Sequence, residues 1–254
     1  MWDWAYAWSI MSELTVSLGT AFAATCWGFA IACVGGLALA AGARSRFAAI
    51  RVPVRGLVQF VRSTPLLVQL FFLYYSLPQA TGMAASAFLT GIVGLGLHFS
   101  TYMSEVYRAG IDGVPRGQWE AAKALNFSGG QTWFKIILPQ ALPPMIPVMG
   151  NYLIIIFKET PVLSAITLVE ALLTAKNLTS ESYRFFEPYT IVGILFLLIC
   201  TALSALLRRA ERRFNRNSDR TASERSSRTG RRKHEHAADP AATAAAAGSE
   251  VHPG

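Results

Sequence analysis

The sequence predicts an all-α integral membrane protein, and two observations carry this prediction. Hydrophobic residues make up 52% of the chain and charged residues 15%, with a mean hydropathy of +0.35, a balance that suits a bilayer better than a water-soluble fold. Residues 63–104 contain no Lys, Arg, Asp or Glu, which is long enough for two helical crossings joined by the turn-rich segment 77–82.

The apolar stretches define five expected membrane spans. In chain order they cover residues 14–41, 64–77, 84–107, 140–157 and 189–207. Together they form a transmembrane domain over residues 14–214, with an external N-terminal segment, residues 1–13, before it and a basic tail after it.

Prolines mark the start of two of these spans. Pro65 suits the first position of a helix, where its missing N–H costs nothing, and this puts Arg62 at the membrane edge. Pro143, Pro144 and Pro147 interrupt the start of the fourth span, which we expect to be kinked or irregular. Such a backbone is tolerated only where protein or a cavity covers the freed carbonyls.

The distribution of positive charge predicts the orientation. Residues 42–56 hold four Arg and no acid, and the polar segment 107–139 holds two Arg and two Lys, so both are expected in the cytoplasm. Residues 1–12 have no Lys or Arg, and residues 158–188 have three against four Glu, so both are expected outside. Five spans then put the N-terminus outside and the C-terminus in the cytoplasm, where the tail from Arg208 carries eleven Lys and Arg.

The tail, residues 215–254, is expected to be disordered, because it is rich in Arg, Ser and then Ala and has no hydrophobic period. Topology accounts for the excess positive charge, so no nucleic-acid partner is predicted. The remaining candidate metal ligands are interpreted as polar filler in the tail or packing residues in the spans: His234, His236, Cys26, Cys33 and Cys200. No metal site and no cofactor are expected in this chain.

A polar island, residues 107–139, interrupts the apolar pattern and is typical of a docking surface. It contains Glu120-Ala121-Ala122, then Asn126 after three residues, then Ile136 and Leu138-Pro139. This spacing resembles the cytoplasmic signature of permease subunits of ATP-binding-cassette importers. That family usually has glycine at the position of Asn126, which must turn between two short helices, and asparagine also tolerates the left-handed conformation.

The resemblance extends over about residues 10–210, to the branch of these permeases that imports polar amino acids such as histidine, glutamine and arginine. The segments that carry it are Arg62–Phe72, Glu105–Ile111, Gly117–Gln118, Leu138–Leu142 and Lys158–Thr160. Within that branch three segments are similar to permeases for ectoine and hydroxyectoine: Met1–Trp4, Gly94–His98 and Ala124–Asn126.

The resemblance implies a multi-pass inner-membrane subunit, not an enzyme, that translocates a small zwitterion by alternating access. Its implied partners are an ATP-binding-cassette ATPase dimer, an extracytoplasmic solute-binding protein and a second permease subunit of the same or a homologous chain. The sequence has no Gly-x-x-x-x-Gly-Lys-Ser/Thr phosphate-binding loop, in keeping with ATP hydrolysis on another subunit. A short coupling helix, residues 117–125, would dock on that ATPase.

The expected contacts of this coupling helix come from its polar and aromatic residues. Glu120 would pair with a basic group of the ATPase or cap its own loop. Trp119 with Phe127 would supply apolar contact, or Trp119 would anchor the helix at the headgroups. The full set of expected coupling residues is Gly117, Trp119, Glu120, Ala121, Ala122 and Asn126.

Ionisable residues in or near the spans are the candidates for the substrate path, because charge there is costly. His98 and Glu105 are seven residues apart and share a helix face. Glu159 could bind the cationic end of a zwitterion, with Gln69, Ser100 and Thr101 as hydrogen-bonding groups. Each hydroxyl could instead bond its own helix, and Glu105 could pair with Arg108.

A second class of function, an autonomous ion-coupled carrier or channel, remains open at this point. Five spans without a detectable inverted repeat make it the less natural interpretation.

Overall fold

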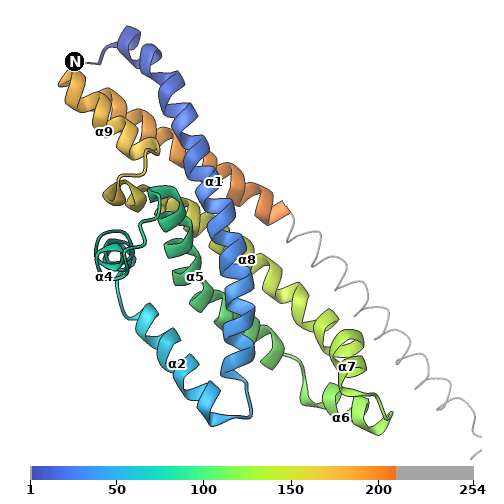
Figure 1. Ribbon diagram of the computed structural model, residues 1–254. Coiled ribbons are helices and arrows are strands. Elements are labelled where there is room, and N and C mark those ends of the chain that lie inside the picture. Colours follow the sequence, from blue (N-terminus) through green and yellow to red (C-terminus); the bar gives the residue numbers. More distant parts are fainter. Residues whose placement is uncertain (1, 210–254) are drawn as a thin grey trace, which may run out of the picture. The chain divides into compact units, whose positions relative to one another are not determined.

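The computed structural model of the protein describes residues 2–209, and every regular element in that range is helical (Figure 1). The predicted tail, residues 215–254, lies outside the described residues. The elements are α1 (Trp4–Ala43), α2 (Ala48–Arg62), α3 (Leu66–Phe71), the π-helical turn η1 (Phe72–Ser76), α4 (Leu77–Thr81), α5 (Ala87–Asp112), α6 (Arg116–Ala124), α7 (Gly129–Thr132), the π-helical turn η2 (Trp133–Ile137), α8 (Leu138–Glu159), the 3-10 helix η3 (Thr160–Ile166), α9 (Ala171–Ser182) and a final helix, Phe186–Arg209.

Three helical stretches in the described range are long and apolar enough to cross a membrane: α1, the run Gly129–Ile166 and the final helix. The pair formed by α2 and the segment Leu66–Thr81, bent by 105°, would be a fourth. The predicted span 84–107 corresponds to α5, which is not among these apolar stretches. Helix α5 is more polar than they are, because five of its buried side chains are polar. Five crossings therefore stays a prediction.

The first helix begins earlier than predicted. The carboxylate of Asp3 accepts hydrogen bonds from the N–H groups of Ala5 and Tyr6 and so caps α1 at Trp4. A helix of 40 residues is about 60 Å long at 1.5 Å per residue, roughly twice the hydrocarbon core of a bilayer. The predicted external segment, residues 1–13, is thus mostly helical, and α1 must extend beyond the bilayer.

The predicted loop 42–56 and the second span, 64–77, are also organised differently. Helix α2 occupies most of the loop, and the span is one uninterrupted helical run, formed by α3, η1 and α4, that extends to Thr81. Pro65 has extended backbone angles (φ −63°, ψ 138°) and precedes α3, so the helix starts one residue later than predicted. The side-chain amide of Gln69 bridges the break between α2 and α3. It donates to the carbonyl oxygens of Val61 (2.8 Å) and Thr64 (3.1 Å).

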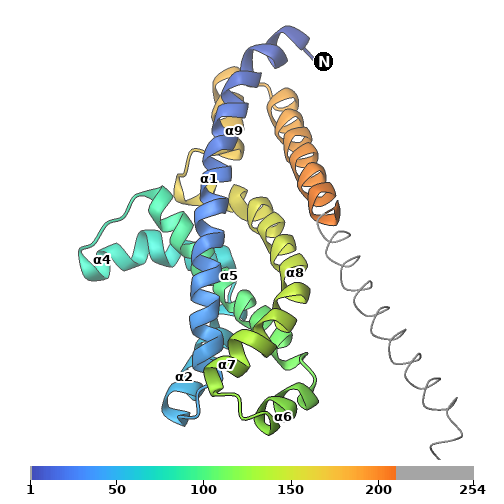
Figure 2. The ribbon, with the colours of Figure 1, turned by 90° about the vertical axis from the view of Figure 1, so that its right-hand side faces the viewer.

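Helix α8 is continuous through Pro143, Pro144 and Pro147. The irregularity expected in this region lies before these three prolines, in the π-helical turn η2. After α8 the chain turns through η3 into α9, whose N-terminus is capped by the buried carboxylate of Glu170, 2.9 Å from two backbone N–H groups. Figure 2 shows α8 and the final helix on the same side of α1.

The close approach of α1 and α5 builds the main core. A Cβ atom added to Gly36 would lie 2.4 Å from Cβ of Met103, and one added to Gly96 would lie 2.4 Å from Cγ2 of Ile31. Glycine at these positions lets the two backbones pack tightly, as in membrane helix pairs. The buried cluster at this contact contains Ala24, Ala32, Leu70, Ile92, Leu95, Phe99, Met103, Ile156, Leu163, Ile166 and Leu168.

Replacing Gly36 by alanine tests this contact. We expect Gly36→Ala to lower stability by about 1–3 kcal/mol through overpacking, against a helix-propensity gain of at most about 1 kcal/mol. The matched control is Gly19→Ala, also in α1, where an added Cβ meets nothing within 4 Å. Thermal unfolding of both variants in the same detergent measures the difference, and equal midpoints would contradict the close α1–α5 contact.

Candidate functional site

The polar island folds into two short helices joined by a tight turn. Helix α6 covers nearly the expected residues, and Asn126 has φ 55°, so the predicted left-handed conformation is present. The N–H of Asn126 donates to the carbonyl of Lys123, and that of Phe127 donates to the carbonyl of Ala122, both at 3.0 Å. Ser128 and Gln131 then form a capping box that starts α7. The turn is fixed by local hydrogen bonds.

Most of the expected coupling residues are exposed. Gly117, Glu120, Ala121 and Asn126 lie on the surface, whereas Ala122 is fully buried and holds α6 against the bundle. Trp119 is half-buried and packs edge-on against Trp133 of η2, with ring centroids 5.4 Å apart.

The structure thus gives Trp119 an internal role that the sequence did not indicate, because its ring joins α6 to η2. Phe127, at the turn, is 37% exposed and is therefore more available to a partner than Trp119.

A cavity of about 600 Å³ lies between the α2–α3 junction, α5 and α8, and is called the polar cavity below because Arg62, His98 and Glu159 line it. It is lined by Arg62, Ser63, Thr64, Pro65, Leu66, His98, Phe99, Tyr102, Tyr152, Ile155 and Glu159. It thus contains two of the predicted path residues, His98 and Glu159. Another predicted path residue, Gln69, does not line the cavity but contacts His98, since Gln69 Oε1 and His98 Nδ1 are 3.1 Å apart. Because the Gln69 amide nitrogen already donates to two carbonyls, its oxygen is the acceptor and His98 Nδ1 is the donor.

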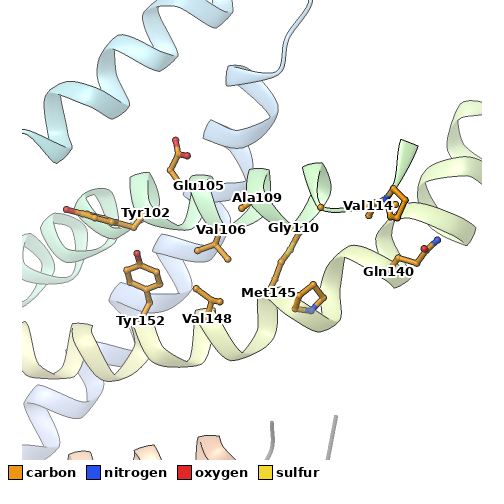
Figure 3. Close-up of a pocket in the computed structure, with 13 residues that line it drawn as sticks. Tyr102, Glu105, Val106, Ala109, Gly110, Val114, Gln140, Met145, Val148 and Tyr152 are labelled. Atoms are coloured by element: carbon orange, nitrogen blue, oxygen red, sulfur yellow. The ribbon is translucent and has the colours of Figure 1, made fainter. Parts of the chain in front are cut away.

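A second, more apolar cavity of about 620 Å³ continues between α5 and α8 (Figure 3). Its lining residues are Tyr102, Glu105, Val106, Ala109, Gly110, Gly113, Val114, Pro115, Gln140, Pro144, Met145, Val148 and Tyr152. Glu105 lies at its edge and forms an ion pair with Arg108, the structural role that the sequence left open. Arg62 Nη1 is 3.9 Å from the other carboxylate oxygen of Glu105.

Ser100 and Thr101 do not line either cavity. Their hydroxyls donate to the carbonyls of Leu97 and His98 in their own helix, at 2.7 Å each, and both residues are buried. A Cβ atom added to Gly35 would lie 3.0 Å from Cβ of Ser100, so this face of α5 packs against α1. Ser100 thus belongs to the α1–α5 contact, and both hydroxyls are used within their own helix.

Three cavity residues were not singled out from the sequence: Arg62, Tyr102 and Tyr152. Arg62, expected at the membrane edge, has its guanidinium carbon 5.1 Å from the ring centroid of Tyr102. Tyr102 lies on the helix face shared by His98 and Glu105, and this spacing was a usable signal. Tyr152 gave no signal, because its role depends on how α8 crosses α5.

Long apolar helices around a polar cavity, with a short exposed helix between α5 and α8, define a multi-pass membrane transport subunit. The family model for binding-protein-dependent transport system inner membrane components matches residues 33–216, and the chain belongs to this family. It is therefore an inner-membrane subunit that is not itself an enzyme, and ATP is hydrolysed on a separate subunit. The autonomous ion-coupled carrier finds no support in these comparisons.

Two curated relatives and two solved structures illustrate the likeness. The probable amino-acid ABC transporter permease protein y4tG of Sinorhizobium fredii is 45% identical over 80% of this chain and 88% of its own length. PatM of Vibrio harveyi, also a probable amino-acid ABC transporter permease protein, is 32% identical over 84% of this chain and 97% of its own.

Among structures, a chain of an amino acid ABC transporter crystallised with histidines has a TM-score of 0.80 at 31% identity, covering 84% of this chain and 99% of that one. A chain of the MetNI methionine ABC transporter has a TM-score of 0.64 at 20% identity, covering 80% of this chain and 97% of that one, and shares the fold.

The turn at Asn126 generates a prediction about local stability. Asn126→Gly should leave it intact, while Asn126→Val should destabilise it by about 1–2 kcal/mol, because a β-branched residue is strained at positive φ. Trypsin cleavage after the neighbouring Lys123 should then be about 5–30-fold faster in the valine variant. Equal cleavage of the two variants would show that this turn is not held in the left-handed conformation.

Proposed function

We propose that the protein is the permease subunit of an ATP-driven amino-acid importer and moves a small zwitterion into the cell by alternating access. The observation that carries this proposal is the polar cavity, in which Arg62 and Glu159 offer opposite charges to one solute. Family membership supports it, as do the relatives named as arginine (ArtQ), nopaline (NocM) and octopine (OccM) transport permeases.

The chemistry of the cavity supports a zwitterionic substrate. A guanidinium binds a carboxylate through charge-assisted hydrogen bonds, and a carboxylate such as Glu159 binds an ammonium or amidinium group. The hydrogen-bonded pair of Gln69 and His98 adds further polar groups beside them. A volume near 600 Å³ is within the usual range of small-molecule sites. Within this class, ectoine and hydroxyectoine are the narrower proposal, on the similarity of residues 1–4, 94–98 and 124–126.

The proposed membrane arrangement has five crossings, with the N-terminus outside and the C-terminus in the cytoplasm. The Arg residues of the segment 42–56 and the Lys and Arg residues of the polar island support it, by the positive-inside rule. Helix α6 would then face the cytoplasm.

In this arrangement α6 docks on a dimer of ATP-binding-cassette ATPases, and closure of that dimer moves the spans as rigid bodies. A solute-binding protein delivers substrate to the outer face, and a second permease subunit completes the transporter. The exposure of Glu120 on a helix anchored by the buried Ala122 supports the coupling role.

Reversing the charge on α6 tests the coupling role. Glu120→Arg should leave the protein inserted but reduce ATP-driven uptake at least tenfold, because the altered charge repels the basic group it is proposed to meet. The measurement is co-purification of the ATPase in mild detergent and uptake by proteoliposomes with the binding protein present. Glu181→Arg, the same change at an exposed position of α9, is the matched control for ATPase recovery. Normal uptake by the Glu120 variant would contradict the coupling assignment.

Removing the carboxylate from the polar cavity tests the substrate assignment. Glu159→Gln should lower uptake about 10–100-fold, which corresponds to the loss of a charge-assisted hydrogen bond of about 1.5–3 kcal/mol. Labelled arginine, histidine, glutamine and ectoine, offered singly to the complete importer, identify which solute is affected. Glu181→Gln serves as control, since Glu181 lies outside both cavities. Unchanged uptake of the transported solute would remove Glu159 from the path.

A further inference from the structure

Two tyrosines separate the polar cavity from the apolar cavity. Tyr102 of α5 and Tyr152 of α8 line both, and each cavity otherwise has its own set of lining residues. Their ring centroids are 5.8 Å apart, and Figure 3 shows the two rings approaching each other at one end of the apolar cavity. The two cavities therefore meet at this pair, between α5 and α8.

The hydroxyl groups of Tyr102 and Tyr152 do not fix the two rings. Within the described part of the chain neither phenol oxygen makes a hydrogen bond, whereas the hydroxyl of Tyr107 donates to the carbonyl of Cys33 and that of Tyr74 pairs with Thr167. Both rings are half-buried. Rotation of Tyr102 or Tyr152 would thus break no hydrogen bond, which is what a movable barrier requires.

Arg62 holds one of the rings in place. Its guanidinium lies over the face of Tyr102, while its Nη1 atom is 3.9 Å from Glu105 at the edge of the apolar cavity. The same side chain lines the polar cavity, where a substrate carboxylate would arrive. A charge-assisted hydrogen bond to a carboxylate is stronger than a cation–π contact at a partly exposed site, so the carboxylate would draw Arg62 from the ring.

We infer that Tyr102 and Tyr152 form a gate between the two cavities, and that Arg62 keeps it closed until a carboxylate binds. This inference rests on the proposed function, because it assigns the two cavities to one substrate route. The gate would separate the polar binding chamber from the opposite membrane face, as alternating access requires.

Thiol labelling of the complete importer in proteoliposomes tests the gate without knowledge of the substrate. In a background with Cys26, Cys33 and Cys200 changed to alanine, Ser63→Cys reports on the polar cavity and Ala109→Cys on the apolar cavity. A membrane-impermeant methanethiosulfonate reagent is added to one face at a time. We expect the two positions to react from opposite faces. Reaction of both from the same face in the parent would overturn the gate.

Variants of the gate residues then give the sharper result. Tyr152→Ala should raise labelling of Ala109→Cys from the Ser63 face at least tenfold, Tyr152→Phe should not, and Arg62→Gln should give an intermediate increase. Tyr102→Ala provides an independent opening should the first variant fail to assemble, with unchanged Ser63→Cys labelling and ATPase recovery as the folding check. Unchanged labelling in both alanine variants overturns the gate even if uptake is normal. Absence of ATP-driven uptake of arginine, histidine, glutamine and ectoine by the importer with its native cysteines overturns the proposed function instead.

Discussion

The contact between α1 and α5 is the constraint on which the rest of the structure depends. Glycines at positions 36 and 96 let the two helices approach so closely that one face of α5 is filled by α1, and Ser100 turns its hydroxyl back to its own helix there. The opposite face, with His98, Tyr102 and Glu105, is then left to meet α3 and α8. Packing on one side of α5 thus decides which of its polar residues can reach a solute.

A second constraint is the break at Pro65. Without it α2 and α3 would form one straight helix, and Arg62 would lie on a regular surface. The 105° bend removes the regular helical partners of the carbonyls at the junction, and the amide of Gln69 donates to two of them while its oxygen accepts from His98. One side chain therefore links the stability of the bend to the geometry of the cavity, in keeping with the rule that irregular backbone at membrane depth lines a cavity or is covered by protein.

Local features of the sequence predicted much of this. Apolar length indicated the long helices, and the spacing around Glu120 indicated a short helix followed by a left-handed turn at Asn126, because both depend on neighbouring residues. The π-helical turn within residues 64–77 and the early start of α1 were missed, since each depends on local hydrogen bonds that hydrophobic length does not reveal. Tyr152 and the cavity role of Arg62 could not be predicted, because they arise only where α8 and the bend meet α5.

The order of the two cavities has a consequence for selectivity. In the proposed substrate site, Arg62 and Glu159 favour a solute that carries both charges, since a solute with a negative charge alone would leave Glu159 without a partner. The apolar cavity beyond Tyr102 and Tyr152 offers Glu105 and Gln140 as its polar groups among hydrophobic walls, and Glu105 is already paired with Arg108. A net-neutral zwitterion loses less hydration energy in such a passage than an ion, whose charge would be uncompensated. On the proposed route, an apolar passage behind the charged cavity would oppose leakage of inorganic ions.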